Sequence, residues 1–163
     1  MTRVLVTGAS GFIGRQVVEQ LLAAGHEVHA ACGRQVLDGP VVHQLDLLEP
    51  CAAAQLIARV RPERLLHLAW CAKPRVYWTS PENISWVRAS LELLEAFQRH
   101  GGEQAVLVGS CAEYDWNGEG VCREEQTPLL PATPYGRCKN ATRELAALFG
   151  QLHGMPIAWA RVF

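Results

Sequence analysis

The stretch TGASGFIG at residues 7–14 decides the fold, because it places three glycines at a turn between a predicted strand and a predicted helix. Gly8 suits a tight turn, Gly11 lets the backbone approach a phosphate closely, and Gly14 allows close packing of helix on strand. The N–H groups and dipole of the following helix can hold an anion. The loop therefore predicts a dinucleotide-binding site, with a simple tight turn as the alternative.

Short strand-like runs alternate with longer helical runs, which is the pattern of strand–helix–strand units around a parallel sheet. The predicted strands cover residues 3–7, 27–32, 41–45, 64–69, 104–109 and 156–162, and the predicted helices cover 12–24, 50–60, 80–99 and 135–152. Residues 110–133 form a long connection, and loops of that length are usually functional. The expected fold class is α/β: a three-layer Rossmann fold whose parallel, doubly wound sheet has about six strands and helices on both faces.

The 163 residues correspond to one domain with the composition of an ordinary globular protein. With 15 Lys+Arg against 16 Asp+Glu the formal net charge is -1, which argues against a nucleic-acid-binding surface. The longest apolar stretches fall far short of the ~20 residues that cross a bilayer, and no export signal is recognisable. The six cysteines have neither C-x-x-C pairs nor zinc-finger spacing, so we expect free thiols and a cytoplasmic protein.

The end of the second predicted strand distinguishes two forms of the dinucleotide. An acidic residue there would bond the ribose of NAD, whereas an arginine would contact the 2′-phosphate of NADP. No carboxylate occurs between His29 and Gly33, and Arg34 follows. NADP is therefore favoured over NAD, with a solvated Arg34 as the alternative. Asp46, after the third strand, could accept a hydrogen bond from the adenine amine or could only cap a turn.

Tyr135 and Lys139 are four residues apart at the beginning of the last predicted helix, so they share one face. A phenol has a pKa of ~10, so it titrates near pH 7 only if the phenolate is stabilised over the phenol by about 4 kcal/mol. An ammonium ~4 Å away can supply that stabilisation. We expect Lys139, helped by an oxidised nicotinamide, to make Tyr135 a general acid/base in this way. Ser110 would lie at the carboxyl edge of the sheet, where such folds bind ligands, or would only cap the strand end.

Five motifs together resemble the extended short-chain dehydrogenase/reductase superfamily, in its branch of NAD(P)-dependent nucleotide-sugar epimerases, dehydratases and reductases. They are TGASGFIG at 7–14, LDL at 45–47, LLHLA at 65–69, GSCAEY at 109–114 and TPYGRCK at 133–139. Because they run from the first strand to the last helix, the resemblance covers essentially the whole chain. It implies an enzyme acting on a nucleotide-linked sugar, by 4-keto reduction or by epimerisation through a transient keto sugar.

The resemblance also implies a role for each matching residue. Tyr135 would be the catalytic acid/base, Lys139 would bind the nicotinamide ribose and lower the pKa of the tyrosine, and Ser110 would be the catalytic serine. Cofactor contacts would come from Gly8, Ser10, Gly11, Phe12, Ile13, Gly14, Arg34, Asp46, Leu47, Leu68, Ala69, Trp70, Tyr135 and Lys139, and substrate contacts from Cys111 and Ala112. No metal site is expected.

One departure from the family pattern bears on the reaction. Dehydratases of the family carry acidic residues two or three positions before the tyrosine matched by Tyr114, but these positions are Cys111 and Ala112 here. The only acid nearby is Glu113, one position off. A dehydratase, which needs a second acid/base to expel water, is therefore disfavoured, whereas reduction and epimerisation need only hydride transfer and Tyr135.

Two other departures point to an unusual subgroup and leave the substrate open. Where the family usually has Tyr-Gly, this sequence has Tyr114-Asp115-Trp116. Where the family often has an asparagine in the helix after the fourth strand, this sequence has Trp86. The resemblance further implies that helices 80–99 and 135–152 could pair across a two-fold axis in a homodimer.

Three alternative functions have some support in the sequence. A thiol or metal site could use Cys111, or His67 with Cys71, but neither spacing completes a set of ligands. A serine hydrolase would need a second glycine after Ser110. The strongest alternative is a cofactor-binding but catalytically incomplete fragment or module. Members of the resembling family continue after the sixth strand with a region that contacts the nucleotide of the substrate, and we expect this chain to be a Rossmann domain without it.

Overall fold

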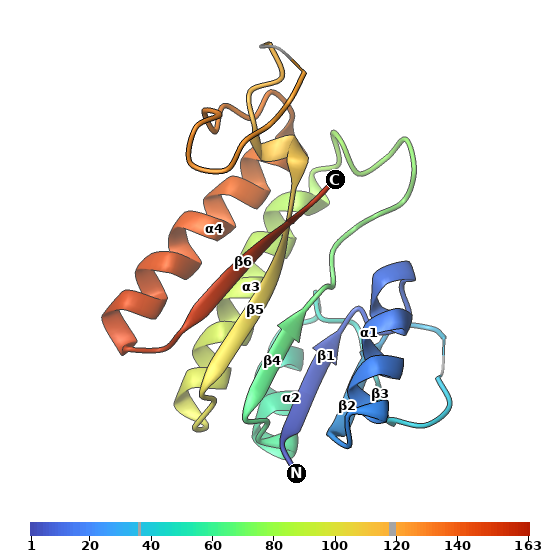
Figure 1. Cartoon of the computed structure of the whole chain (residues 1–163). Coiled ribbons are helices and arrows are strands. Elements are labelled where there is room, and N and C mark those ends of the chain that lie inside the picture. The colour runs from blue at the N-terminus through green and yellow to red at the C-terminus, as the bar shows by residue number, and fades with distance from the viewer. Residues whose placement is uncertain (36, 118–119) are drawn as a thin grey trace.

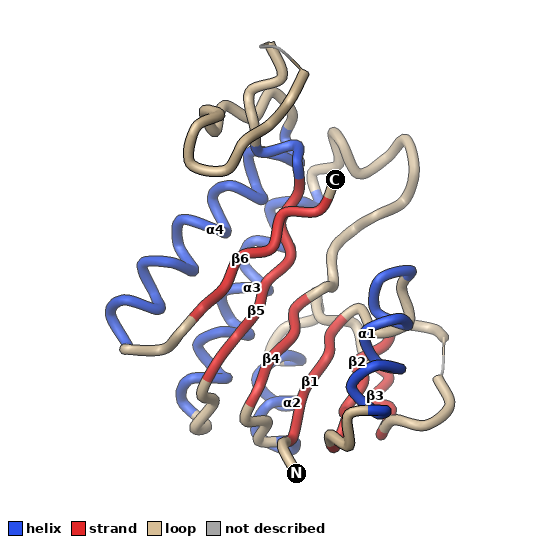
Figure 2. Tube along the Cα trace, viewed as in Figure 1, coloured by secondary structure: helices blue, strands red, loops and turns tan. Residues whose placement is uncertain are grey.

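Six strands form one parallel sheet in the order β3-β2-β1-β4-β5-β6 (Figures 1 and 2). They are β1 (Arg3–Thr7), β2 (Glu27–Cys32), β3 (Val41–Gln44), β4 (Arg64–His67), β5 (Gln104–Ser110) and β6 (Ile157–Val162). The structure is a computed structural model that describes residues 1–35, 37–117 and 120–163. The chain returns from β3 at one edge to β4 beside β1, so the strand order reverses between β1 and β4, where such folds bind ligands.

Four α-helices and one 3₁₀ turn connect the strands. They are α1 (Phe12–Ala23), α2 (Ala52–Val60), α3 (Glu82–Arg99), η1 (Cys111–Glu113) and α4 (Pro134–His153). Figure 1 shows α1 on one face of the sheet and α2, α3 and α4 on the other. The predicted Rossmann fold with helices on both faces is therefore confirmed, although three of the four helices share one face.

Several boundaries differ from the prediction, by one or two residues each. The helix predicted over 50–60 begins at Ala52, because Cys51 before it has a left-handed backbone with φ of 62°. The strand predicted over 64–69 ends at His67, because the backbone then turns to bond the end of β1. The predicted loop 110–133 begins with Ser110 still in β5 and continues into η1, while its residues 118 and 119 lie outside the described residues.

Each face of the sheet has its own apolar core, because successive side chains of a strand point to opposite faces. The larger core lies under α2, α3 and α4, and the smaller one lies under α1. Fully buried members of the larger core include Leu5, Leu65, Leu93, Leu94, Phe97 and Leu107, and the smaller core contains Val4, Val6, Val18, Val28 and Ala30. This packing fixes the carboxyl ends of β1, β4 and β5 relative to one another.

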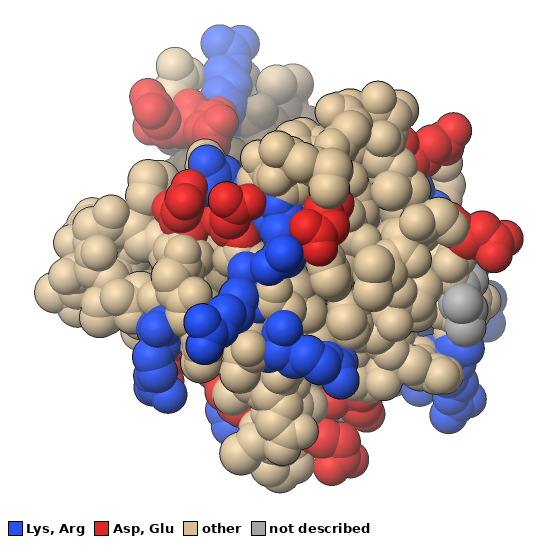
Figure 3. Space-filling view, turned by 90° about the horizontal axis from the view of Figure 1, so that it is seen from below, with Lys and Arg blue, Asp and Glu red and all other residues tan. Residues whose placement is uncertain are grey.

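The opposite edge of the sheet carries mixed charge. Viewed from the amino ends of the strands, basic and acidic side chains are interspersed (Figure 3). Arg3 pairs there with Glu27 at 3.0 Å, and Arg64 pairs with Glu103. This face therefore lacks the uniformly positive charge that would attract nucleic acid. Within the described residues, no helix is both long enough and apolar enough to span a membrane.

A chain of buried hydrogen bonds ties β1, β4 and α3 together below the carboxyl edge. His67 Nδ1 lies 2.7 Å from the Thr7 hydroxyl, and His67 Nε2 lies 2.8 Å from the Ser90 hydroxyl. The Thr7 hydroxyl also accepts from Ala69 N at 3.3 Å, and the Ser90 hydroxyl donates to the Trp86 carbonyl at 2.8 Å. Since the one proton of Ser90 goes to the Trp86 carbonyl, His67 Nε2 must donate to Ser90, and Nδ1 of a neutral ring then accepts from Thr7.

Burial favours a neutral His67, because it penalises the charged ring. Burial lowers the pKa of His67 from 6.5 to about 3, and the nearby charge of Lys139 contributes to the same shift. His67 therefore has a structural role, and in the described residues no group of three His, Cys, Asp or Glu could hold a metal ion.

We expect acid to destabilise the fold through His67. The folded pKa lies below the unfolded value, so this contribution is complete above about pH 6.5 and is lost as the pH falls towards about 3. A drop to pH 5 should remove about 2 kcal/mol from the free energy of unfolding. Denaturant unfolding across this range should show a shallower pH dependence for His67→Gln. The exposed His153→Gln is the control, and equal pH dependence in wild type and His67→Gln would contradict the assignment.

Candidate functional site

The glycine loop brings the backbone of β1 against the turn after β4. Gly8 has a positive φ of +67°, and a Cβ atom there would lie 2.7 Å from the backbone nitrogen of Ala69. A Cβ on Gly14 would clash with the carbonyl oxygen of Gly8, so α1 packs closely on the loop. Gly11 precedes α1 without a side-chain hydrogen bond to the helix N-terminus. The first N–H groups of α1 thus have no side-chain cap and can face an anion.

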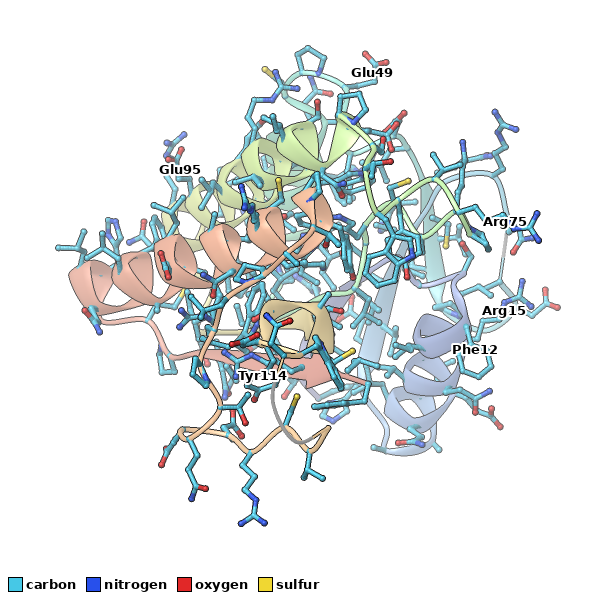
Figure 4. All side chains as sticks on the ribbon, turned by 90° about the horizontal axis from the view of Figure 1, so that it is seen from above. Phe12, Arg15, Glu49, Arg75, Glu95 and Tyr114 are labelled. Atoms are coloured by element: carbon cyan, nitrogen blue, oxygen red, sulfur yellow. The ribbon has the colours of Figure 1, made fainter. Side chains whose placement is uncertain are left out.

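The side chains at the beginning of α1 point outward. Phe12 is 89% exposed, and Figure 4 shows it beside Arg15 at the outer side of the molecule. Phe12 and Ile13, both predicted to contact the cofactor, can thus offer mainly backbone N–H groups. Arg15, which the sequence analysis missed, donates to the Ser10 carbonyl at 3.0 Å and to Gln35 Oε1 at 2.7 Å. It links the glycine loop to the turn after β2.

A cavity of about 510 Å³ opens beside the glycine loop at the carboxyl edge of β1, β2 and β3. Six predicted cofactor residues line it, whereas the side chain of Leu68 packs against the core under α1. Asp46 lines the cavity and also accepts from Leu48 N at 2.9 Å, so it caps a turn as well. The lining residues are Gly8, Ala31, Cys32, Gly33, Arg34, Gln44, Leu45, Asp46, Leu47, Ala69, Trp70 and Trp86.

The three predicted catalytic residues come from β5 and α4, which pack against each other. Thr133 begins α4 by accepting from Gly136 N at 3.1 Å, and Pro134 is the first helical residue. This cap sets Tyr135 in the first turn, and Lys139 follows one turn later on the same face. Lys139 is 5% exposed, and its amine donates to the Val108 carbonyl of β5 at 2.8 Å. The Ser110 hydroxyl, also buried, accepts from Ala112 N at 3.2 Å.

Burial moves the pKa values of the pair in opposite directions. It raises the pKa of Tyr135 above its ordinary value, while the nearby Ser110 hydroxyl acts in the opposite direction. Burial lowers the pKa of Lys139 to about 7, opposed by the Glu113 carboxylate. The lowering of the Tyr135 pKa by Lys139 and an oxidised nicotinamide stays a prediction, because it concerns the protein with that cofactor bound. A protonated Tyr135 is suited to donate a proton.

Aromatic rings enclose Tyr135. Tyr77 and Trp78 meet its ring edge-on, with centroids 4.8 and 5.6 Å away, and Trp70 does so at 6.4 Å. The Trp78 carbonyl also accepts from Tyr135 N at 3.2 Å. These residues belong to the segment between β4 and α3, which sequence reasoning had connected with the site only through Trp70. Their burial of the phenol explains its raised pKa.

Glu113 forms the support behind Ser110. Its carboxylate is fully buried and accepts from Ser110 N at 2.7 Å, from Trp159 Nε1 at 3.0 Å and from Arg161 Nε at 2.9 Å. Trp159 and Arg161 come from β6, so the carboxylate connects the end of β5 to the edge strand. Its lone pairs are thus occupied by structural donors. The predicted substrate residues Cys111 and Ala112 lie between Ser110 and this carboxylate, in η1.

Residues 4–163 match the NAD dependent epimerase/dehydratase family. The chain belongs to this family. Similar proteins include UDP-glucose 4-epimerase 4 of Oryza sativa subsp. japonica, which is 29% identical over 165 residues, covering 87% of this chain and 43% of its own. The dTDP-6-deoxy-L-talose 4-dehydrogenase (NAD(+)) of Aggregatibacter actinomycetemcomitans is 26% identical, in an alignment that covers 98% of this chain and 60% of that protein.

A solved family structure has the same fold. The UDP-glucose 4-epimerase of Thermus thermophilus, in complex with NAD, superposes with a TM-score of 0.86 at 32% identity, over 98% of this chain and 54% of that one. This chain thus spans about half the length of the relatives that it matches. The resemblance expected from the five sequence motifs is confirmed at the level of the family.

The approach of Gly8 to Ala69 gives a stability prediction with a matched control. Gly8→Ala adds both left-handed strain and a backbone clash, whereas Gly25→Ala adds only the strain, because Gly25 has φ of +80° and open space around its Cβ position. Gly8→Ala should lower the free energy of unfolding by at least ~2 kcal/mol more than Gly25→Ala. Chemical denaturation of both variants measures the difference, and equal losses would contradict the close approach.

Proposed function

We propose that this chain holds an NADP-type dinucleotide along the carboxyl edge of its sheet and serves in the reduction or epimerisation of a nucleotide-linked sugar. One observation carries the proposal: the cavity beside the glycine loop ends at Trp70, and Trp70 contacts the residues that can move a proton, Lys139 and Tyr135. The binding cavity and the reactive groups are therefore neighbours along one edge. Membership of the epimerase/dehydratase family supports this order.

The cavity suits the adenosine end of a dinucleotide. Asp46 and Leu47 line it where an adenine would lie, and Arg34 lines it where a 2′-phosphate would lie. The backbone N–H groups at the beginning of α1 suit a pyrophosphate, which Gly8 and Gly11 allow to come close. Arg34 and the lack of a carboxylate at the end of β2 favour NADP, although the similar epimerase from Thermus thermophilus was solved with NAD.

The reactive residues suit proton donation to a carbonyl. A bound reduced nicotinamide supplies the hydride. The raised pKa of Tyr135 keeps its phenol protonated, so it can donate that proton to the oxygen of a 4-keto sugar. The Ser110 hydroxyl can donate a hydrogen bond to the same oxygen, and Cys111 and Ala112 follow it as substrate contacts. For oxidation or epimerisation, the phenolate would need the positive charge of Lys139 closer than the Val108 contact leaves it.

Dehydration is less well supported than hydride transfer. Glu113 is the acid nearest to Ser110 in sequence, and Ser110 N, Trp159 and Arg161 donate to its buried carboxylate. A group held in this way is a poor second acid/base, because protonating it would remove the partner of a buried arginine.

A homodimer is part of the proposal. α3 and α4 lie side by side (Figure 1), and α4 exposes Leu145, Leu148 and Leu152 at helical spacing. An apolar stripe of this kind can pack against its copy across a two-fold axis. Sedimentation that finds only monomer would contradict the pairing.

The function is tested by separating binding from turnover. NADPH binding is measured by fluorescence, and NADPH oxidation is measured with a panel of nucleotide-linked 4-keto sugars. Tyr135→Phe should lower turnover at least ~100-fold and change NADPH affinity less than about threefold. Tyr114→Phe removes a buried phenol other than the predicted proton donor and is the control.

Three outcomes of that assay differ in meaning. Turnover by wild type that Tyr135→Phe abolishes supports the enzyme. NADPH binding without turnover of any sugar supports the second candidate, a cofactor-binding module that is catalytically incomplete. Absence of NADPH binding overturns both.

The preference for NADP is tested at Arg34. Arg34→Ala should weaken NADPH about 10- to 100-fold, because a charge-assisted bond to the 2′-phosphate is lost, and should change NADH less than about twofold. Arg99→Ala removes an exposed arginine at the end of α3 and is the control. An equal loss of affinity for NADPH and NADH would show that Arg34 does not bind the 2′-phosphate.

A further inference from the structure

Trp70 separates the adenosine cavity from the reactive residues. Its indole lines one end of the cavity, and the centroid of the same ring lies 4.0 Å from the Lys139 amine. Ser110, Tyr135 and Lys139 are not among the residues that line that cavity. A ligand that fills the cavity therefore meets Trp70 before it reaches the amine.

The position of the indole depends on one buried amide. Trp70 Nε1 donates to Asn83 Oδ1 at 2.8 Å, and the Asn83 amide donates to the carbonyls of Tyr77 at 2.7 Å and Ser80 at 2.9 Å. Asn83 is 1% exposed, so these bonds fix both the indole and the segment that bears Tyr77. Within the described part of the chain, the hydrogen bond to Asn83 Oδ1 is the one that the Trp70 side chain makes.

One feature favours a second position of the ring. The Lys139 ammonium has three donors, and the described structure gives it one oxygen acceptor, so hydroxyl groups would be better partners than an indole face.

We propose that Trp70 is a specificity-determining gate, which leaves the adenosine cavity open but must swing away from Lys139 before the second ribose of a dinucleotide can bind. The inference rests on the proposed function, in which Lys139 binds that ribose. The gate lowers the affinity for a whole dinucleotide relative to its adenosine half, because only the open fraction of the protein accepts the second ribose.

The cover over Lys139 can be measured without any cofactor, because the sequence has only two lysines, Lys73 and Lys139. Lys73 is exposed and serves as the internal reference. With a pKa of about 7, Lys139 is mostly the reactive neutral amine near pH 8. Slow acetylation at that pH would therefore mean that the Trp70 ring shields the amine from the reagent. Mass spectrometry after a short pulse of an acetylating ester gives the ratio of modified Lys139 to modified Lys73.

Trp70→Ala should raise this labelling ratio at least about tenfold, and Trp70→Phe, which keeps a ring but loses the bond to Asn83, about threefold. Trp78→Ala is the matched control, since Trp78 also lies against Tyr135, and it should change the ratio less than about threefold. An unchanged ratio in both Trp70 variants, or an equal rise in Trp78→Ala, would overturn the gate. Should Trp70→Ala fail to fold, Trp70→Phe decides.

Calorimetry with two probes then tests the consequence. Adenosine 2′,5′-bisphosphate fills only the adenosine half, whereas NADP includes the second ribose. Trp70→Ala should tighten NADP at least about tenfold and leave adenosine 2′,5′-bisphosphate within about twofold. Unchanged or weaker NADP binding would overturn the gate even if Lys139 is uncovered. Failure of both probes to bind wild type and variants would overturn the proposed function, and with it the ligand assigned to the gate.

Discussion

A single neutral imidazole holds the binding edge in place. His67 accepts from Thr7 and donates to Ser90, so one buried side chain connects β1, β4 and α3. The hydroxyl of Thr7 in turn accepts from Ala69 N, which holds the turn after β4 against Gly8. Every donor in this chain has one acceptor, and reversing one link would leave another unsatisfied. The geometry of the glycine loop and the start of the segment that bears Trp70 both depend on this arrangement.

From that fixed point the edge of the sheet divides into two chemically different halves. The β1–β3 side provides glycine backbone, Arg34 and Asp46 around an open cavity. The β5 and α4 side provides buried ionisable groups under aromatic rings, and burial there moves the pKa of Tyr135 up and that of Lys139 down. The first half is suited to recognition of phosphate and base, and the second to control of a proton. Trp70 lies at the boundary.

The sequence predicted the fold and much of the site, because strand periodicity, the glycine spacing and the cap of α4 are local signals. It placed Ser110, Tyr135 and Lys139 correctly at one sheet edge. It could not show that Lys139 is directed at the Val108 carbonyl, that His67 is a structural link, or that Asn83 anchors Trp70, because these contacts join residues far apart in the chain. Nor could it show that the rings of a distant loop bury Tyr135 and so raise its pKa.

The buried Glu113 also determines how the edge strand can pair. Parallel β6 has a neighbour on one side within the described sheet, and such strands are prone to slip along their partner. A slip by one residue would turn Trp159 and Arg161 to the opposite face and place Ala158, Ala160 or Val162 beside the carboxylate. That alternative leaves the buried carboxylate with Ser110 N but without Trp159 and Arg161, and it turns Ile157 and Trp159 away from the core, so ionic and apolar contacts together set the register of β6.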